Sequence, residues 1–353
     1  MQKFPTIILF SPIQLTMQSP AEKKQGVYTY VSQWPIYSLA WSVRRDKNTR
    51  LAIGSFLEDY SNKVELVQFD HETTFDFTTD SRLVFDHPYS PTNLMFFPSE
   101  DTTNPDIIAT SGDFLRLWEI HDDRIELKAL LNGNKSSEFN SAITSFDWAE
   151  CDTRRIATSS VDTTCSIWDI ESEIVDSQLV AHDKEVYDIS WGGFNVFASV
   201  SGDGSVRVFD LRDKERSTII YENPIRDTPL LRLEWNKGDP RFIATVGMDS
   251  NRVVILDIRF PTTPLMELTK HKASVNAVSW APRIGRQLCS AGDDSRALIW
   301  EVVGPSFRSE INGDLEPEMW YGSTAEINQA RWSPVEMDWI AIAFLNKLQL
   351  LKV

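Results

Sequence analysis

The 353-residue sequence contains only three cysteines, Cys151, Cys165 and Cys289, and they show no CxxC or Cys/His ligand spacing. An odd and sparse set of cysteines does not form a disulfide framework, and it is natural in a reducing compartment. No apolar run approaches the ~20 residues that span a bilayer. Neither GxxxxGK[ST] nor GxGxxG follows an expected strand. These absences exclude a disulfide-stapled fold, a helical membrane protein and the common phosphate-binding loops.

Basic residues are also few. The chain has 35 Lys and Arg against 51 Asp and Glu, a formal net charge of −16. Phosphate-led binding of nucleic acid requires a basic surface, so direct nucleic-acid binding is not expected. An acidic surface is compatible with basic protein partners, or serves only to keep the protein soluble. The 42% hydrophobic content and 12 Trp indicate a well-packed globular protein rather than a disordered one.

The first 20 residues differ in texture from the rest. They lack Asp and Glu, and Pro5 and Pro12 bracket a short apolar run, Ile7–Phe10. A targeting peptide and a disordered tail are the alternatives. Lys3 is the only basic residue, and this favours the tail. We therefore expect a disordered tail over residues 1–20 and one folded domain over residues 24–353.

A repeat organises the remaining chain. Its clearest copy has three β-type runs, Val186–Trp191, Val196–Val200 and Ser205–Leu211, and the last two are separated by the tight turn Ser201–Gly204. An aromatic residue ends the first run of seven such units, at intervals of 43 to 55 residues: Trp41, Phe96, Trp148, Trp191, Trp235, Trp280 and Trp332. The third runs end in phase at Phe69-Asp70, Trp118-Glu119, Trp168-Asp169, Phe209-Asp210, Leu256-Asp257, Trp300-Glu301 and Leu351-Lys352. The period is at or slightly above the ~40–45 residues of a WD40 blade.

The repeat resembles a seven-bladed WD40 β-propeller, an all-β ring of four-stranded antiparallel sheets. The sequence ends within the third strand of unit seven, Asn346–Val353. We expect Val27–Val31 to supply the missing outer strand and close the ring, because an unpaired apolar edge invites aggregation. Outer strands are also expected at Gln178–Ala181, Leu265–Leu268 and Trp320-Tyr321, and a loop is expected at Asp70–Asp80.

Several polar residues fall where WD40 proteins share a buried hydrogen-bond chain. These are His271, Ser290, Asp294 and Trp300 in blade six; His182, Ser199 and Asp203 in blade four, where Phe209 replaces Trp; and Thr158, Asp162 and Trp168 in blade three, which lacks the His. Ser, His and Asp together superficially indicate nucleophilic catalysis. Their recurrence at equivalent positions instead favours a turn-clamping role. We therefore expect no enzyme activity, no cofactor and no metal site.

Two adjacent blades end their third strands in Asp-x-Arg: Asp210-Leu211-Arg212 and Asp257-Ile258-Arg259. This resembles the box by which WD40 substrate receptors dock on the adaptor of cullin–RING ubiquitin ligases. An exposed Arg can pair with a partner's carboxylate or carbonyls. The alternative is that each Arg pairs with an acidic neighbour in its own blade.

Longer stretches resemble one family of WD40 proteins, among them WSVRRDK (41–47), SGDFLRLWEI (111–120), AHDKEVYDI (181–189), GSVRVFDLRDKE (204–215) and MDSNRVVILDIRFPT (248–262). They are similar to the plant light-regulated WD proteins and the transparent testa glabra protein. Their animal counterparts scaffold kinases and include cullin-associated factors.

The resemblance implies a non-enzymatic scaffold, monomeric within larger complexes, that assembles protein kinases and transcription factors of the MYB, basic helix-loop-helix or TCP type. It implies a co-regulator of clock or developmental programmes in the nucleus and cytoplasm. The alternative is a substrate receptor of a cullin–RING ligase. Loop residues carry function on propellers, and aromatics and Arg dominate interfaces. The expected contacts are Trp34, Tyr37, Tyr89, Phe114, Phe139, Tyr187, Arg252, Asn276 and Arg296.

Overall fold

The computed structural model describes residues 26–58, 61–132, 141–283, 285–302 and 315–353. Within these ranges the chain is all β, apart from turns and one short 3-10 segment, Arg45–Lys47. None of the described helical residues forms a segment long and apolar enough to cross a membrane. The tail expected over residues 1–20 and the expected contact Phe139 lie outside the described residues.

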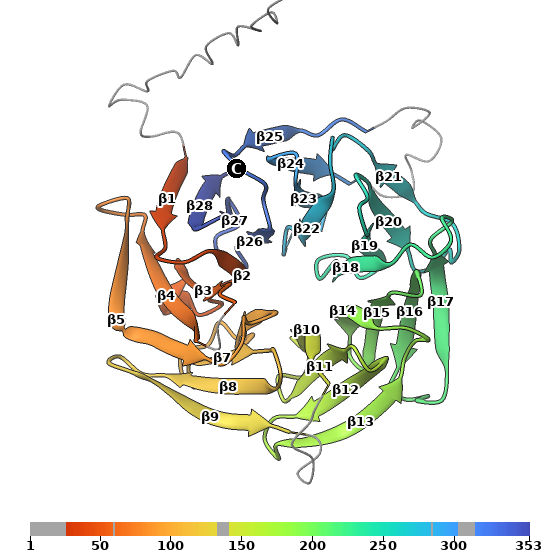
Figure 1. The fold of residues 1–353 in the computed structure, drawn as a ribbon, viewed down its shortest axis with the longest axis horizontal. Coiled ribbons are helices and arrows are strands. Elements are labelled where there is room, and N and C mark those ends of the chain that lie inside the picture. The colour runs from red at the N-terminus through yellow and green to blue at the C-terminus, as the bar shows by residue number, and fades with distance from the viewer. Residues whose placement is uncertain (1–25, 59–60, 133–140, 284, 303–314) are drawn as a thin grey trace, which may run out of the picture.

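Seven four-stranded antiparallel sheets form a ring around a central axis (Figure 1), as the sequence predicts. Blade one contains β2 (Ile36–Trp41), β3 (Arg50–Ser55), β4 (Asn62–Asp70) and β5 (Asp76–His87). Blade two contains β6 (Leu94–Phe96), β7 (Ile107–Thr110), β8 (Leu115–Ile120) and β9 (Ile125–Leu131). Blade three contains β10 (Ile143–Trp148), β11 (Arg155–Ser160), β12 (Thr164–Asp169) and β13 (Ile174–Val180).

The second half of the ring follows the same order. Blade four contains β14 (Val186–Gly193), β15 (Val196–Ser201), β16 (Ser205–Asp210) and β17 (Ser217–Glu222). Blade five contains β18 (Leu230–Trp235), β19 (Phe242–Gly247), β20 (Val253–Asp257) and β21 (Met266–Leu268). Blade six contains β22 (Val275–Trp280), β23 (Gln287–Gly292), β24 (Arg296–Glu301) and β25 (Met319–Gly322). Blade seven contains β26 (Gln329–Trp332), β27 (Trp339–Phe344), β28 (Lys347–Lys352) and β1 (Val27–Val31).

Blade seven closes the ring as predicted. β1 pairs antiparallel with β28, with Val27 opposite Leu351 and Val31 opposite Lys347. The apolar strand β28 is therefore paired on both sides, and β1 forms the outer edge of the last blade.

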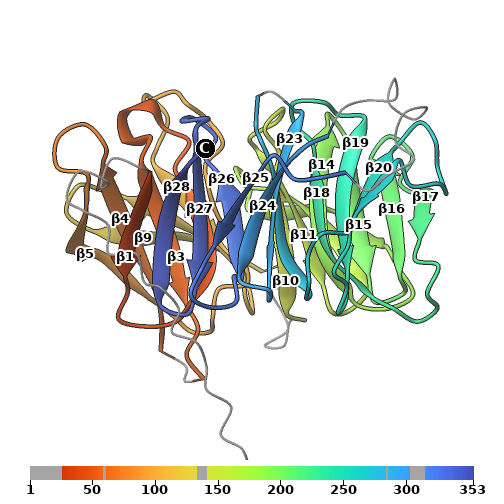
Figure 2. The ribbon, with the colours of Figure 1, turned by 90° about the horizontal axis from the view of Figure 1, so that it is seen from above.

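Strand direction alternates within each blade, and this defines two faces of the ring (Figure 2). We call the face that carries the start of each first strand and the turn between the second and third strands the upper face. The lower face carries the turns between the first and second strands and between the third and fourth strands.

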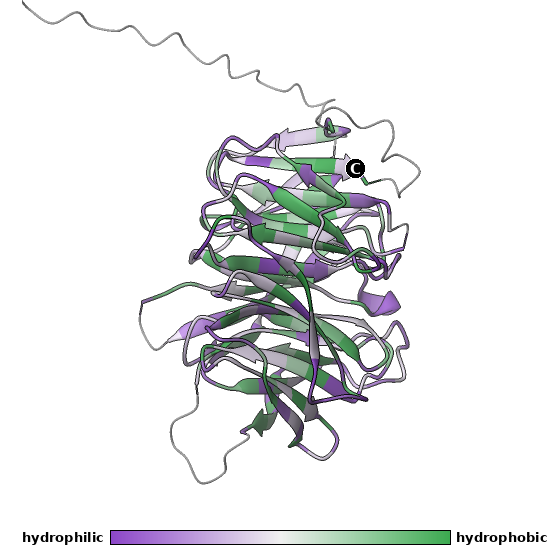
Figure 3. Ribbon diagram, turned by 90° about the vertical axis from the view of Figure 1, so that its right-hand side faces the viewer, coloured by the Kyte–Doolittle hydropathy of each residue, from purple (hydrophilic) through white to green (hydrophobic). Residues whose placement is uncertain are grey.

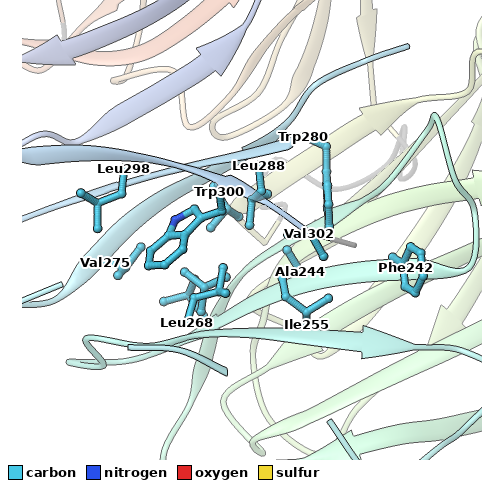
Figure 4. Packing of buried hydrophobic residues seen from close by; sticks show 13 residues of the cluster. Phe242, Ala244, Ile255, Leu268, Val275, Trp280, Leu288, Leu298, Trp300 and Val302 are labelled. Carbon is cyan, nitrogen blue, oxygen red and sulfur yellow. The ribbon is translucent and has the colours of Figure 1, made fainter. Parts of the chain in front are cut away.

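A hydrophobic cluster fills each of the seven interfaces between neighbouring blades. Between blades five and six, Leu268, Val275 and Leu288 lie around the fully buried Trp300, and Trp280 belongs to the same cluster on the far side of Leu288 (Figure 4). Full burial of one large apolar side chain is worth about 1.5–3 kcal/mol. Apolar residues lie mainly along the strands and polar residues at the turns (Figure 3). The apolar faces of neighbouring sheets therefore pack against each other.

The predicted outer strands are present as β13, β21 and β25. The loop expected at Asp70–Asp80 is confined to the turn at residues 71–75, and its second half is wrong. β4 and β5 form a long hairpin, and Asp76 already belongs to β5. Phe77 packs on Phe69 with a centroid distance of 5.0 Å, and this contact extends the pairing. The acidic run looked like a loop because most of its side chains face solvent.

Candidate functional site: two faces and the channel between them

The polar chain predicted in blade six is complete. His271 Nδ1 lies 3.1 Å from both carboxylate oxygens of Asp294, and His271 Nε2 lies 2.8 Å from Ser290 Oγ. Trp300 Nε1 donates to the same hydroxyl at 2.8 Å. Burial lowers the pKa of His271, although Asp294 opposes the shift, so the ring is neutral at pH 7. The chain clamps the loop before β22 to the turn between β23 and β24.

Blade four repeats the clamp without its Trp. His182 bonds Asp203 Oδ2 at 3.0 Å and Ser199 Oγ at 2.8 Å. Phe209 has no donor, and it stacks on Phe197 with a centroid distance of 4.9 Å. In blade three, Trp168 Nε1 donates to Thr158 Oγ1 at 2.9 Å, and Asp162 accepts from the Thr164 amide at 3.1 Å. The structure therefore brings the predicted residues together in blades four and six, whereas in blade three Asp162 bonds its own turn and not the Thr158–Trp168 pair.

Blade two contains a fourth clamp that the sequence analysis missed. His87 Nε2 lies 3.1 Å from Thr110 Oγ1, and Trp118 Nε1 donates to that hydroxyl at 3.0 Å. Burial lowers the pKa of His87 to about 4, so this ring is also neutral at pH 7. The order of His, hydroxyl and Trp, which recurs from blade six, could have indicated this clamp in the sequence. The spacing from hydroxyl to Trp differs, however: it is eight residues here and ten in blades three and six.

The geometry of these clamps does not support nucleophilic catalysis. Ser199 and Ser290 are both 0% exposed, so an external substrate cannot reach either hydroxyl. A hydrolase would need an exposed nucleophile beside an oxyanion hole. No group of three or more His, Cys, Asp or Glu side chains that could hold a metal is present in the part of the chain that the structure describes.

The inner strands are linked by a ladder of hydrogen bonds that the sequence analysis also missed. The residue before the terminal Trp of one blade accepts from the Trp amide of the next blade. Asp147 Oδ2 accepts from Trp191 N at 2.7 Å, and Ser190 Oγ accepts from Trp235 N at 3.1 Å. The ladder continues from Glu234 Oε1 to Trp280 N (3.2 Å) and from Ser279 Oγ to Trp332 N (3.0 Å). It ties blades three to seven around the channel.

Charged side chains line a channel cavity of about 380 Å³ at the centre of the ring. Lys237 Nζ of blade five reaches Asp147 Oδ2 of blade three at 2.8 Å, across blade four. Burial opposes the charge of Lys237, but Asp147 and Glu150 outweigh burial and raise its pKa. Burial raises the pKa of Glu234 to about 7, and its Oε2 atom has no partner among the described residues.

The lower mouth of this channel is crossed by ion pairs. Glu100 of blade two pairs with Arg45 of blade one and with Arg283 of blade six, both at 2.6 Å. Blades two and six are not neighbours, so this Arg45–Glu100–Arg283 cluster spans the ring. Both Arg side chains are exposed, which limits the strength of the link.

The expected contacts on the upper face fall into three groups. Tyr37 and Asn276 line one upper cavity of about 680 Å³. Others hold intramolecular partners: Arg252 pairs with Glu267 at 3.1 Å, and the guanidinium of Arg296 lies 5.1 Å from the Trp320 ring centroid. The remaining described contacts lie at separate positions on this face: exposed Tyr89 and half-buried Trp34, Phe114 and Tyr187.

On the lower face both Asp-x-Arg pairs have the same geometry. Arg212 Nε lies 2.9 Å from Asp210 Oδ1, and Arg259 Nε lies 2.9 Å from Asp257 Oδ1. The Arg212 contact lowers the pKa of Asp210 to about 2. Each Arg therefore pairs with an Asp of its own blade, which is the alternative that the sequence left open. The guanidiniums nevertheless stay open to solvent, with the Arg212 side chain 74% and the Arg259 side chain 43% exposed.

Comparison with known proteins agrees with this architecture. The family model described as "WD domain, G-beta repeat" matches residues 129–169, 175–210 and 262–301. A Dictyostelium discoideum protein named "DDB1- and CUL4-associated factor 7 homolog" is 50% identical over 336 residues, which cover 94% of this chain and 100% of that protein. A WD repeat-containing protein of Schizosaccharomyces pombe is 31% identical, covering 92% of this chain and 89% of its own length. A WD repeat-containing protein of Saccharomyces cerevisiae is 33% identical, covering 89% of this chain and 65% of its own length.

None of these three relatives bears the name of the plant proteins, so that finer part of the resemblance stays a resemblance. The cullin-associated part is the one that a relative's name carries. With seven WD40 blades and a full-length relative at 50% identity, the chain belongs to the WD40-repeat family, in the group of the DDB1- and CUL4-associated factor 7 homolog.

Proposed function

We propose that this chain is a non-enzymatic adaptor that serves as a substrate receptor of a cullin–RING ubiquitin ligase. The observation that carries the proposal is the full-length similarity to a protein named for association with DDB1 and CUL4. In this role the lower face docks on the ligase adaptor and the upper face is free for a second protein.

Arg212 and Arg259 are the docking residues in this proposal. Each Asp-x-Arg carboxylate fixes its Arg through Nε and Nη2, and Nη1 donates to no acceptor among the described residues. A guanidinium held in one orientation loses less entropy when it binds a carboxylate or carbonyl of a partner. Two such groups on adjacent blades give the docking surface a fixed spacing.

The test is a pull-down of the purified chain with the purified ligase adaptor, using the double variant R212E and R259Q. Gln is chosen at position 259 because the Asp257 side chain is fully buried and needs a donor. We expect adaptor binding to fall at least 10-fold with little change in Tm, because the Arg212–Asp210 pair is exposed and contributes little stability, and because R259Q keeps a donor for Asp257. R216E, an exposed lower-face change in the same blade as Arg212, is the matched control and keeps binding. Full binding by a folded double variant contradicts the proposal.

A scaffold for kinases and for MYB, basic helix-loop-helix or TCP regulators is the second candidate. The net charge of −16 favours it, because DNA-binding partners are basic and are attracted to an acidic surface. Its clock or developmental role and its residence in nucleus and cytoplasm belong to this proposal. The R212E, R259Q protein separates the two: a scaffold keeps its transcription-factor partners, and its co-regulator activity is unchanged.

A further inference from the structure

The upper cavity lies on the upper face, and residues of blades five, six, seven and one line it. Tyr37 and Phe56 of blade one, Asn276 and Asp293 of blade six, and Glu326 and Leu345 beside blade seven contribute to its lining. The inner strands β2, β18, β22 and β26 approach each other in this sector of the ring (Figure 1). Its volume of about 680 Å³ accommodates several side chains of an incoming peptide.

Two large apolar side chains stand exposed at this cavity. Phe56 is 50% exposed and Leu345 is 58% exposed. The Tyr37 ring packs beside Phe56 with a centroid distance of 5.4 Å, so Phe56 is braced from one side. Exposed apolar groups that flank a cavity with a polar lining are typical of a protein-interaction site.

Leu345 also adopts an unfavourable backbone conformation. Its φ is +50°, in the left-handed region that Asn and Gly populate far more readily than Leu. The turn is held there because Leu345 O accepts from Ile36 N at 2.7 Å and Asn346 O accepts from Ser32 N at 2.8 Å. A strained turn that presents an exposed Leu instead of Asn or Gly points to a function for that side chain.

The charges of the cavity are unbalanced. Asp293 accepts from Asn276 Nδ2 at 2.6 Å, and Glu326 is exposed and makes no ion pair with any described residue. Arg232 is the cation in the lining, and its Nε already donates to Asn276 O at 2.9 Å. Two carboxylates against one guanidinium favour a cationic ligand, as does the net charge of −16.

We propose that the upper cavity binds an extended segment of a partner protein in which a Lys or Arg lies within three residues of a bulky apolar side chain. The apolar side chain packs against Phe56 and Leu345, and the cation pairs with Glu326 and Asp293. This inference deepens the proposed receptor role. Only the identification of the bound segment as part of a ligase substrate rests on that role.

The test probes an array of immobilised 12-residue peptides, systematically varied in basic and apolar positions, with the fluorescently labelled full chain. The wild type is expected to select peptides that combine Lys or Arg with Leu, Phe or Met. Leu345→Asn should reduce binding at least 10-fold while Tm stays equal or rises, because Asn suits the turn. Glu326→Lys should reduce it similarly, with the remaining binding less sensitive to salt. Val180→Thr, an exposed apolar change on the outer strand β13, is the control and keeps wild-type binding.

Unchanged binding by both cavity variants overturns the proposal, as does selection of acidic peptides. Concentration-dependent self-association in sedimentation that Leu345→Asn abolishes, with no peptide selected, also overturns it in favour of a second copy as occupant. Adaptor binding in the pull-down above reports the lower face alone, and L345N should leave it unchanged. Failure of peptide binding is therefore distinguishable from failure of the receptor role.

Discussion

Closure of the ring by β1 leads to a quantitative prediction for Tyr28. Its ring packs in the interface of blades seven and one, with centroids 4.8 Å from Phe69 and 5.7 Å from Trp339. Truncating a fully buried Phe or Trp to Ala costs about 3–5 kcal/mol. Tyr28 is half-buried, so we expect about half of that transfer loss plus an aromatic contribution of about 0.5–1.5 kcal/mol. Tyr28→Ala should lower the free energy of unfolding by about 2–4 kcal/mol.

The assay is equilibrium unfolding of the full chain in guanidinium chloride, followed by Trp fluorescence. The midpoint should fall with the m-value unchanged. Thr29→Ala is the control on the same strand: its side chain is exposed and accepts one surface hydrogen bond, from Gln349 Nε2 at 2.8 Å, so the change should cost less than about 1 kcal/mol. Deleting residues 1–33 should lower Tm strongly, whereas deleting residues 1–20 should not. Equal midpoints for Y28A and T29A, or equal Tm for the two deletions, would refute the closure argument.

Three further predictions concern the clamps and the channel. Asp203→Ala strands buried donors of His182 and Ser205 and should cost about 1–3 kcal/mol of unfolding free energy in the same assay, with a loss below 0.5 kcal/mol counting against the clamp. The pKa of Glu234 is raised in the folded state, so the native state binds a proton more tightly than the unfolded state does. The stabilisation of the native state by this proton is therefore complete below about pH 4.5 and is lost as the pH rises to about 7. The lowered pKa of His87 has the opposite effect, because it makes the native state more stable as the pH rises from about 4 to 6.5. Subtracting the unfolding free energy of the wild type from that of Glu234→Gln cancels the His87 effect and isolates Glu234. That difference in unfolding free energy should grow by on the order of 2–3 kcal/mol in favour of the variant from pH 4.5 to 7.5, and a flat difference excludes the shift. Glu100→Gln removes two exposed ion pairs and should cost no more than about 1 kcal/mol at low salt and less at 1 M NaCl; a larger loss would mean that the cross-ring cluster holds the ring together.

The sequence predicted the ring well because its markers are local. A Trp or Phe at the end of each inner strand recurs whatever the length of the loops between them, and so does an acidic residue at or near the end of the third strand in six of the seven blades. The closing strand followed from one unpaired edge and one unassigned β-type run. The long β4–β5 hairpin was missed because Phe77 packs on Tyr30 as well as on Phe69, and Tyr30 belongs to β1, far from Phe77 in sequence.

The site was less predictable because it depends on contacts between units. Asp147, Ser190, Glu234 and Ser279 all precede a strand-ending Trp, and this pattern could have indicated the ladder. No local rule indicates that Lys237 reaches Asp147 across blade four, because that contact depends on the width of the channel. The upper cavity likewise requires loops from four blades to meet.

For the Asp-x-Arg residues, the two readings left open by the sequence are compatible in the structure. The Arg groups pair within their own blades, and they also remain exposed. Pairing within the blade therefore orients each Arg without removing it from the surface, and each guanidinium stays accessible to a partner.

The polar residues of this protein fall into two sets: buried residues that hold the ring together, and exposed residues that are free for partners. The His, Ser and Asp residues with a catalytic appearance are buried clamps, and Asp147 and Glu234 accept from amides of the next blade. The exposed groups without such duties, Leu345 and Glu326 above and the Arg212 guanidinium below, occupy opposite faces. Because strand direction alternates, different turns build the two faces, and a substitution on one face leaves the other intact. A rigid ring with two independent faces can hold two proteins at once, and this is the physical requirement of the bridging role that we propose.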